Sequence, residues 1–140
     1  MSNKSVAPTP AQLEKMASCG LEGPIVMVNL LKYRERADYE PQSPEAKERL
    51  TGRDAYRRYG ATAMTCVAER GGAIVWMGPQ AFVFIGGTEQ DWDDVVCVKY
   101  PSRQAFLEMI SSPDYLAATR HRDAALERTA LLCCSAGSAA

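Results

Sequence analysis

The sequence predicts a single α+β domain in which an antiparallel sheet carries its helices on one face. Short apolar runs typical of strands alternate with amphipathic runs typical of helices along the chain of 140 residues. Proline, glycine and small polar residues mark the boundaries between these runs. The length suits one hydrophobic core, and 46% of the residues are hydrophobic, as in ordinary globular proteins.

Composition and charge exclude several classes of protein. The 16 basic and 17 acidic residues give a net charge of -1 without a basic stripe, which argues against a nucleic-acid partner. The apolar runs are too short to cross a membrane, and no signal-peptide pattern opens the chain. We therefore expect a cytoplasmic protein with no membrane partner. Five cysteines without Cys-x-x-Cys spacing and a single histidine predict neither a metal site nor a disulfide framework.

The chain begins with a predicted extension over residues 1–20, whose short helix spans residues 10–19 and is capped by Thr9. Residues 25–33 then form a strand that is apolar on both faces. A strand buried on one side only should alternate with polar residues, so each face of this one needs a cover. Helices can cover one face, and a second subunit is the natural cover for the other.

Residues 34–50 are a charged insertion with two prolines, which we interpret as a solvated loop in preference to one or two helical turns. Thr51 can cap a long helix that ends near Arg70. Two β-type runs follow, at residues 73–77 and 81–85. The Gly-Pro-Gln break between them predicts a bulge, a hairpin or a kink at a sheet edge.

The last third of the chain supplies a strand over residues 95–100, two helices and a final strand over residues 126–134. Ser102 and Ser112 are the predicted caps of the two helices. Residues 21–134 are thus expected to form one domain, and residues 135–140 a flexible tail.

The resulting order, β-α-β-β-α-β, is that of ferredoxin-like domains. In this arrangement the antiparallel sheet leaves one face open, which agrees with the two-sided apolar strand near the start of the chain. Two such sheets packed face to face would cover each other's open faces.

Several short motifs resemble those of a known family when their order and spacing are taken together. They are Gly23-Pro24 leading into Val28-Asn29-Leu30-Leu31-Lys32-Tyr33, Gly52-Arg53-Asp54-Ala55-Tyr56 with Tyr59, Gly71-Gly72, Trp76 and Gly78-Pro79, Trp92-Asp93, Tyr100-Pro101-Ser102 with Phe106 and Met109, Pro113-Asp114-Tyr115 and Arg122-Asp123-Ala124-Ala125-Leu126. On these motifs the chain resembles the DUF1330 family, an uncharacterised family of the dimeric α+β barrel superfamily. The resemblance implies a ferredoxin-like homodimer but no activity. Other members of the superfamily include cofactor-free monooxygenases and haem proteins, and their activities would be carried over by fold analogy alone.

His121 is the candidate catalytic base, because its unperturbed pKa lies near neutrality. The alternative is a surface histidine that the dipole favours near a helix C-terminus. Arg122 could hold a substrate carboxylate through its planar guanidinium, or pair with Asp114 or Asp123 on the surface. Adjacent helical residues point about 100° apart, so only one of His121 and Arg122 can face a given site, and we expect Arg122 to do so.

Asn29 is an amide within an otherwise apolar strand, so it must either bond local backbone or face a ligand cavity. The aromatic residues Tyr56, Tyr59, Trp92 and Tyr115 could line a pocket for a flat substrate, or simply pack in the core. Together these side chains predict a site between the sheet and the helices, reached from the side of the insertion.

No glycine-rich phosphate loop and no nucleophile motif accompanies these residues, so no cofactor is expected. The leading functional hypothesis is a dimeric barrel that binds a small organic acid or aromatic compound, with cofactor-free proton transfer or oxygenation as its chemistry if it is an enzyme. The alternative is a non-catalytic binding or structural homodimer.

Overall fold

The structure is a computed structural model that describes residues 6–136. Its elements follow in the order α1 (Pro10–Ser18), β1 (Ile25–Tyr33), the 3-10 helix η2 (Pro44–Lys47), α2 (Gly52–Glu69), β2 (Ala73–Pro79), the 3-10 helix η3 (Thr88–Gln90), β3 (Asp94–Tyr100), α3 (Arg103–Ile110), α4 (Pro113–Ala125) and β4 (Leu126–Ser135). Most of the expected flexible tail, residues 137–140, lies outside the described residues, as do residues 1–5.

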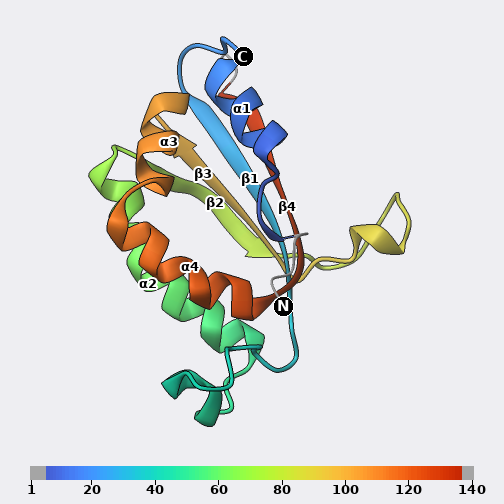
Figure 1. The fold of residues 1–140 in the computed structure, drawn as a ribbon. Coiled ribbons are helices and arrows are strands. Elements are labelled where there is room, and N and C mark those ends of the chain that lie inside the picture. Colours follow the sequence, from blue (N-terminus) through green and yellow to red (C-terminus); the bar gives the residue numbers. More distant parts are fainter. Residues whose placement is uncertain (1–5, 137–140) are drawn as a thin grey trace.

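The four strands form one antiparallel sheet in the order β2-β3-β1-β4. β1 lies in the middle, with Ile25 opposite Tyr100 of β3 and Ser135 of β4. Figure 1 shows α2, α3 and α4 together on one side of this sheet. The strand order and the one-sided helices confirm the predicted ferredoxin-like α+β class.

Side-chain caps explain where most helices begin. Thr51 accepts a hydrogen bond from the backbone N–H of Asp54 at 3.0 Å, and the Asp54 carboxylate accepts one from the N–H of Thr51 at 3.2 Å. This reciprocal pair is a capping box, and Thr9 and Gln12 form another at α1. Ser112 departs from its prediction: it is the residue before α4, but its hydroxyl donates to the Met109 carbonyl oxygen at 2.7 Å and caps nothing.

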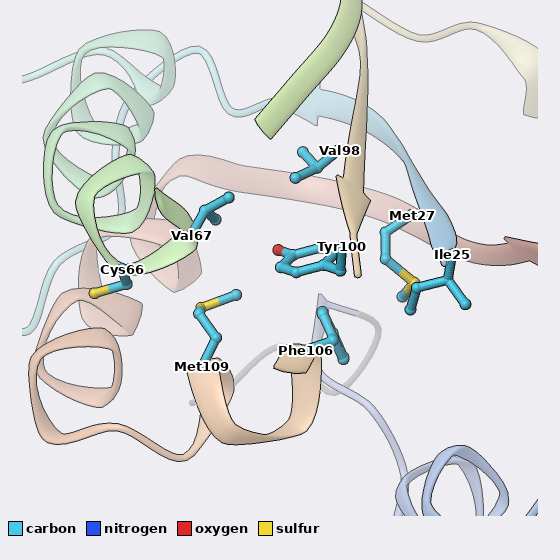
Figure 2. Close-up of a cluster of buried hydrophobic side chains, with 8 residues drawn as sticks. All are labelled: Ile25, Met27, Cys66, Val67, Val98, Tyr100, Phe106 and Met109. Atoms are coloured by element: carbon cyan, nitrogen blue, oxygen red, sulfur yellow. The ribbon is translucent and has the colours of Figure 1, made fainter. Parts of the chain in front are cut away.

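The main core lies between the sheet and the helices. Figure 2 shows its buried side chains converging from β1, β3, α2 and α3: Ile25, Met27, Cys66, Val67, Val98, Tyr100, Phe106 and Met109. A second cluster joins the C-terminal end of β1 to the last turn of α4 through Leu31, Ala125 and Leu126, which are all fully buried. Val6 is buried in this second cluster, so at least this part of the N-terminal extension packs on the domain.

Among the helices of residues 6–136, none lies on the opposite face of the sheet. Alternation along β1 turns Ile25, Met27 and Leu31 toward the helices and turns Val26, Val28 and Leu30 the other way. Register places Cys97 of β3 and Leu132 of β4 beside Val28 on this side. We call it the bare face.

The prediction of a strand at residues 81–85 is wrong. β2 ends at Pro79, and residues 80–93 form a long connection that includes η3 and projects from the sheet, yellow in Figure 1. We call this connection the arm. Phe82, Phe84 and Ile85 near its tip are 73%, 86% and 87% exposed. Their apolar, β-branched and aromatic composition is typical of a strand, but no neighbouring strand pairs with them.

The insertion over residues 34–50 is more ordered than a solvated loop. It contains η2, its Tyr39 and Glu45 side chains are buried, and the Asp38 N–H donates to the Ala124 carbonyl oxygen at 2.9 Å. These contacts hold the insertion against the end of α4. Within residues 6–136, no helix has both the length and the apolar character needed to span a membrane.

Candidate functional site

Asn29 occupies the middle of β1 and faces the helices. Its Nδ2 donates to the carbonyl oxygens of Val96, at 3.0 Å, and Met27, at 3.3 Å. The two bonds fix the orientation of the amide, so Oδ1 is the atom left to accept a further hydrogen bond. The amide thus bonds local backbone, as one of the two alternatives predicted, and it also lines a hollow.

This hollow has a volume of about 210 Å³ and lies between α2 and the sheet. Its walls come from the inner faces of β1, β2 and β3 and from one side of α2: Asn29, Tyr56, Arg57, Tyr59, Gly60, Ala63, Met64, Ile74, Met77, Val96, Val98 and Tyr100. Most of these side chains are apolar, and the one charged lining residue is Arg57. We call this space the tyrosine hollow.

A row of tyrosines runs from the C-terminal end of β1 past the tyrosine hollow. The ring centroids of Tyr33 and Tyr56 lie 5.5 Å apart, those of Tyr56 and Tyr59 lie 5.1 Å apart, and those of Tyr59 and Tyr115 lie 5.9 Å apart. The hydroxyls of Tyr59 and Tyr115 share a hydrogen bond of 2.9 Å. The structure thus brings together four of the predicted residues, Asn29, Tyr56, Tyr59 and Tyr115, although Tyr115 stands behind Tyr59 and not in the wall.

Burial favours the protonated form of the hydroxyls of Tyr56, Tyr59 and Tyr100. It raises the pKa of Tyr56 to about 12, although the positive charge of Arg122 opposes the rise. Burial likewise raises the pKa values of Tyr59 and Tyr100 well above the usual range. At neutral pH these groups are hydrogen-bond donors, and they are poorly suited to act as bases.

Three polar atoms of the tyrosine hollow are not engaged by other residues. Within the described part of the chain, no hydrogen bond involves Oδ1 of Asn29 or the hydroxyls of Tyr56 and Tyr100. Among the residues described, the fully buried side-chain atoms without a hydrogen-bond partner are Nε of Arg34 and Oε1 of Glu45. The three atoms of the hollow are not among them, so each keeps some access to solvent. The hollow therefore offers an acceptor and two donors within apolar walls.

Tyr33, Asp94 and Arg53 form a polar cluster next to Tyr56. The Tyr33 hydroxyl donates to Oδ2 of Asp94 at 2.7 Å, and a guanidinium nitrogen of Arg53 donates to the same oxygen at 2.8 Å. Arg53 also lies over the Tyr33 ring, 4.6 Å from its centroid. Burial, with the bond to Asp94, raises the pKa of Tyr33. This cluster could not be predicted from the sequence, because it depends on the register that pairs Leu31 with Asp94.

His121 lies away from the tyrosine hollow. Its Nδ1 shares a 2.6 Å hydrogen bond with the hydroxyl of Tyr39 in the insertion. Burial, helped by the charge of Arg120, lowers the pKa of His121. Arg120 itself donates to Glu45 at 2.6 Å. The predicted base is thus part of the contact between α4 and the insertion.

Arg122 points away from His121, as adjacent helical residues do, but the expectation that it faces the site has no support from the lining of the hollow. It donates to the carbonyl oxygen of Val6, and its charge acts on Tyr56 and Tyr59, but it does not line the hollow. No residue of the insertion lines the hollow either, so the predicted approach from that side has no support.

Trp92 belongs to another part of the molecule. It stands at the base of the arm, where the guanidinium of Arg128 lies 4.3 Å from the centre of its ring. It borders a second, more open hollow of about 570 Å³ between the arm and the bare face. Among the described residues, no group of three or more histidine, cysteine, aspartate or glutamate side chains is arranged to hold a metal ion.

The DUF1330 family model, whose description is a domain of unknown function, matches residues 46–135, more than half of the chain. The chain belongs to the DUF1330 family. Two crystal structures of the RPA0582 protein are similar to this DUF1330 protein over almost its whole length. One, of the methylated protein, is 34% identical with a TM-score of 0.87, and the match covers 96% of each chain. The other, described as a protein of unknown function from Rhodopseudomonas palustris, is 35% identical with a TM-score of 0.85, covering 95% of this chain and 97% of that one.

A more distant structure supports the fold alone. It is a dabb family protein with a ferredoxin-like fold from Mesorhizobium loti, 14% identical, with a TM-score of 0.53 over 84% of this chain and 100% of that one. No curated protein matches the DUF1330 chain.

Proposed function

We propose that this DUF1330 protein binds a small ring compound bearing a hydroxyl group in the tyrosine hollow. The observation that carries the proposal is the set of unengaged polar atoms, Oδ1 of Asn29 and the hydroxyls of Tyr56 and Tyr100, within apolar walls. Ligand sites commonly combine a few oriented polar groups with an apolar cleft in this way.

The size and chemistry of the hollow limit the ligand. At about 210 Å³ it is smaller than the pockets of roughly 300–1,000 Å³ that hold drug-sized molecules, so a single ring is the best fit. A phenolic hydroxyl could donate to Oδ1 of Asn29 and accept from Tyr56. Met64, Ile74 and Val96 would contact the ring. Arg57 stands at the wall as a partner for a carboxylate, although it also pairs with Asp54 at 3.3 Å.

Binding accounts for this arrangement better than catalysis. The lining residues include no carboxylate and no imidazole, and the tyrosines are held protonated. His121 bonds Tyr39 instead, which leaves it without a role in this proposal. The carboxylate of Asp94 is already engaged by Tyr33 and Arg53.

The test is a calorimetric titration of the protein with phenol and with toluene, which differ in the hydroxyl group. We expect phenol to bind more tightly, and Asn29→Ala and Tyr56→Phe each to weaken phenol binding about three- to tenfold, the effect of one lost hydrogen bond. Toluene binding should change little in Tyr56→Phe.

Tyr39→Phe is the matched control, because it removes a hydroxyl that bonds His121 outside the hollow. It should leave phenol binding unchanged. Equal affinity for phenol and toluene, or full phenol affinity in both Asn29→Ala and Tyr56→Phe, would contradict the proposal.

We also infer that the bare face is covered by a second copy of the chain. Among the exposed large apolar residues that the structure describes, Trp76 and Leu132 lie on the bare face, in register with Cys97 and Val28, and Phe82, Phe84 and Ile85 lie on the arm beside it. A concentration of this kind is typical of an interface. Light scattering should find a dimer at micromolar concentration, and a monomer there would contradict the inference.

A further inference from the structure

We propose that the arm is a clasp, whose apolar tip packs against a second copy of this chain. The proposal rests on the inferred dimer and adds to it, because it assigns the arm of each copy to the interface. Three features of the arm support it: its composition, its attachment and its position beside the bare face.

The tip of the arm is apolar yet touches little of its own subunit. Phe82, Phe84 and Ile85 are each more than 70% exposed, and a short turn would suffice to join β2 to β3. Burial of such side chains is strongly favourable. A tip of this composition is therefore expected to find a cover outside the subunit.

The arm is held in its projecting position at its base. The Gln80 N–H donates to the Asp93 carbonyl oxygen at 3.1 Å, and the Gln80 side chain accepts from the Trp92 N–H at the same distance. From β4, Arg128 donates to the carbonyl oxygens of Glu89 and Asp91 while it stacks on Trp92. These bonds favour a preformed projection over one that folds back on its own sheet.

The arm and the bare face form one continuous surface with both a projection and a recess. The recess is the hollow of about 570 Å³. Leu30 and Val95 line it on the side of the sheet, and Phe82, Phe84 and Trp92 line it on the side of the arm. In a two-fold dimer the same surface is used by both copies, so each arm can reach the partner's sheet while the partner's arm reaches back.

The charges near the base favour a protein partner over a membrane. Glu89, Asp91 and Asp93 lie there, and the two cations beside them are engaged: Lys32 is paired with Asp91 at 3.1 Å, and Arg128 donates to the carbonyl oxygens of Glu89 and Asp91. Segments that enter an anionic membrane surface are usually flanked by unpaired lysine and arginine. An acidic base beside an apolar tip instead suits a second copy.

The experiment compares the dimer dissociation constants of the wild type and of the double variant Phe84→Ser with Ile85→Ser, by light scattering over a dilution series. Both residues are more than 85% exposed in the subunit, so the substitutions should leave its fold intact, as circular dichroism would show. We expect the dissociation constant to rise about a hundredfold. Leu116→Ser is the control, because Leu116 is 56% exposed on α4, away from both arm and sheet, and it should leave the constant unchanged.

Hydrogen exchange gives a second measurement on the unmodified protein. The amides of residues 81–86 should be protected at concentrations where the dimer forms and should exchange freely on dilution. A double variant that dimerises as tightly as the wild type would overturn the clasp and leave the dimer standing. A monomeric wild type would overturn both. Wild-type binding to phosphatidylcholine and phosphatidylglycerol vesicles that is lost in the double variant would assign the tip to lipid and overturn the clasp.

Discussion

Asn29 shows how one side chain can satisfy its own burial and still present a binding atom. Its Nδ2 bonds to Val96 and Met27 remove the cost of an unpaired buried amide. The same bonds aim Oδ1 without help from a ligand, so the acceptor is preorganised. A polar residue in an apolar strand is a signal that sequence can reveal, and in this chain it marks the wall of the tyrosine hollow.

Two glycines of α2 should respond in opposite directions to substitution by alanine. A Cβ on Gly52 would lie 2.2 Å from the Arg34 carbonyl oxygen and 2.6 Å from that of Ala125, and backbone atoms cannot move aside cheaply. Gly52→Ala should therefore destabilise the protein by more than the ~1–3 kcal/mol typical of overpacking. Gly60 has no atom within 4 Å of its would-be Cβ, so Gly60→Ala should stabilise α2 by about 0.5–1 kcal/mol. Urea denaturation measures both, and equal effects would contradict the packing around Gly52.

His121 should make stability depend on pH near neutrality. Burial lowers its folded pKa below 6.5, so the unfolded chain takes up the proton first. The stabilising contribution is complete above about pH 6.5 and is lost as the pH falls below that value. The pKa of Glu45 is held at about 2 by Arg120, so its contribution is lost only below about pH 4.5.

The measurement is the urea midpoint between pH 7.5 and 5.5. It should fall in the wild type and change less in His121→Gln, which cannot take up the proton. Parallel curves for the two proteins would show that His121 does not carry the effect.

At the scale of elements, local chemistry predicted most of the fold. The apolar run of β1, the cap at Thr51 and the cap at Ser102 are each specified by neighbouring residues, and the structure confirms all three. The arm escaped prediction because an apolar β-type run has the same pattern whether it pairs in a sheet or projects toward a cover. The sequence also did not predict that the insertion is ordered. Its buried residues Tyr39 and Glu45 depend on contacts with α4, which is distant in the chain.

The candidate site was predictable to the same extent. Asn29, Tyr56 and Tyr59 could be proposed from their residue types, and all three line the same hollow in the structure. Tyr100 was missed, because it looked only like the end of a strand, and Ile74 and Met77 were missed because apolar strand residues carry no individual signal. Whether His121 or Arg122 faces a site depends on the rotation of α4, which its weak apolar periodicity does not define.

α1 should depend on one arginine for its attachment. The helix buries none of its own residues fully, and Arg103 of α3 donates to the carbonyl oxygens of Met16, Ala17 and Leu21 at 2.6–3.1 Å. Charged hydrogen bonds of this kind contribute about 1.5–3 kcal/mol each. Arg103→Gln should therefore speed hydrogen exchange of the α1 amides roughly ten- to a hundredfold, with α2 unaffected.

Arg57→Gln is the control for that experiment, since the exposed Arg57 side chain pairs with Asp54 and has no contact with α1. Unchanged α1 exchange in Arg103→Gln would mean that apolar contacts of Met16 and Leu21 with the core hold the helix without it.

At the scale of the whole molecule, the two faces of the sheet differ in what covers them within the subunit. One face is buried by helices and holds the tyrosine hollow, so ligand binding should be possible within one subunit. The other face, with the arm, has no cover in the subunit. The two proposals thus place binding and assembly on opposite sides of a four-stranded sheet, and variants on one side should leave the other function intact.

Val28→Asp tests the cover of the bare face. Val28 points away from the helices, between Cys97 and Leu132 in register, whereas its neighbour Met27 is buried beneath the helices. In a dimer the new carboxylate would be buried without a partner, which is costly, while in a monomer it would reach water. The thermal midpoint of a dimer rises with protein concentration, by about 2–4 °C for each tenfold increase at this size.

We expect the wild type to show this concentration dependence and Val28→Asp to lose it while its thermal midpoint falls. Leu116→Asp, on the exposed side of α4, should keep both the midpoint and its dependence on concentration. If Val28→Asp kept the wild-type midpoint at every concentration, the bare face would have to be open to water, because only a solvated carboxylate at that position carries no penalty.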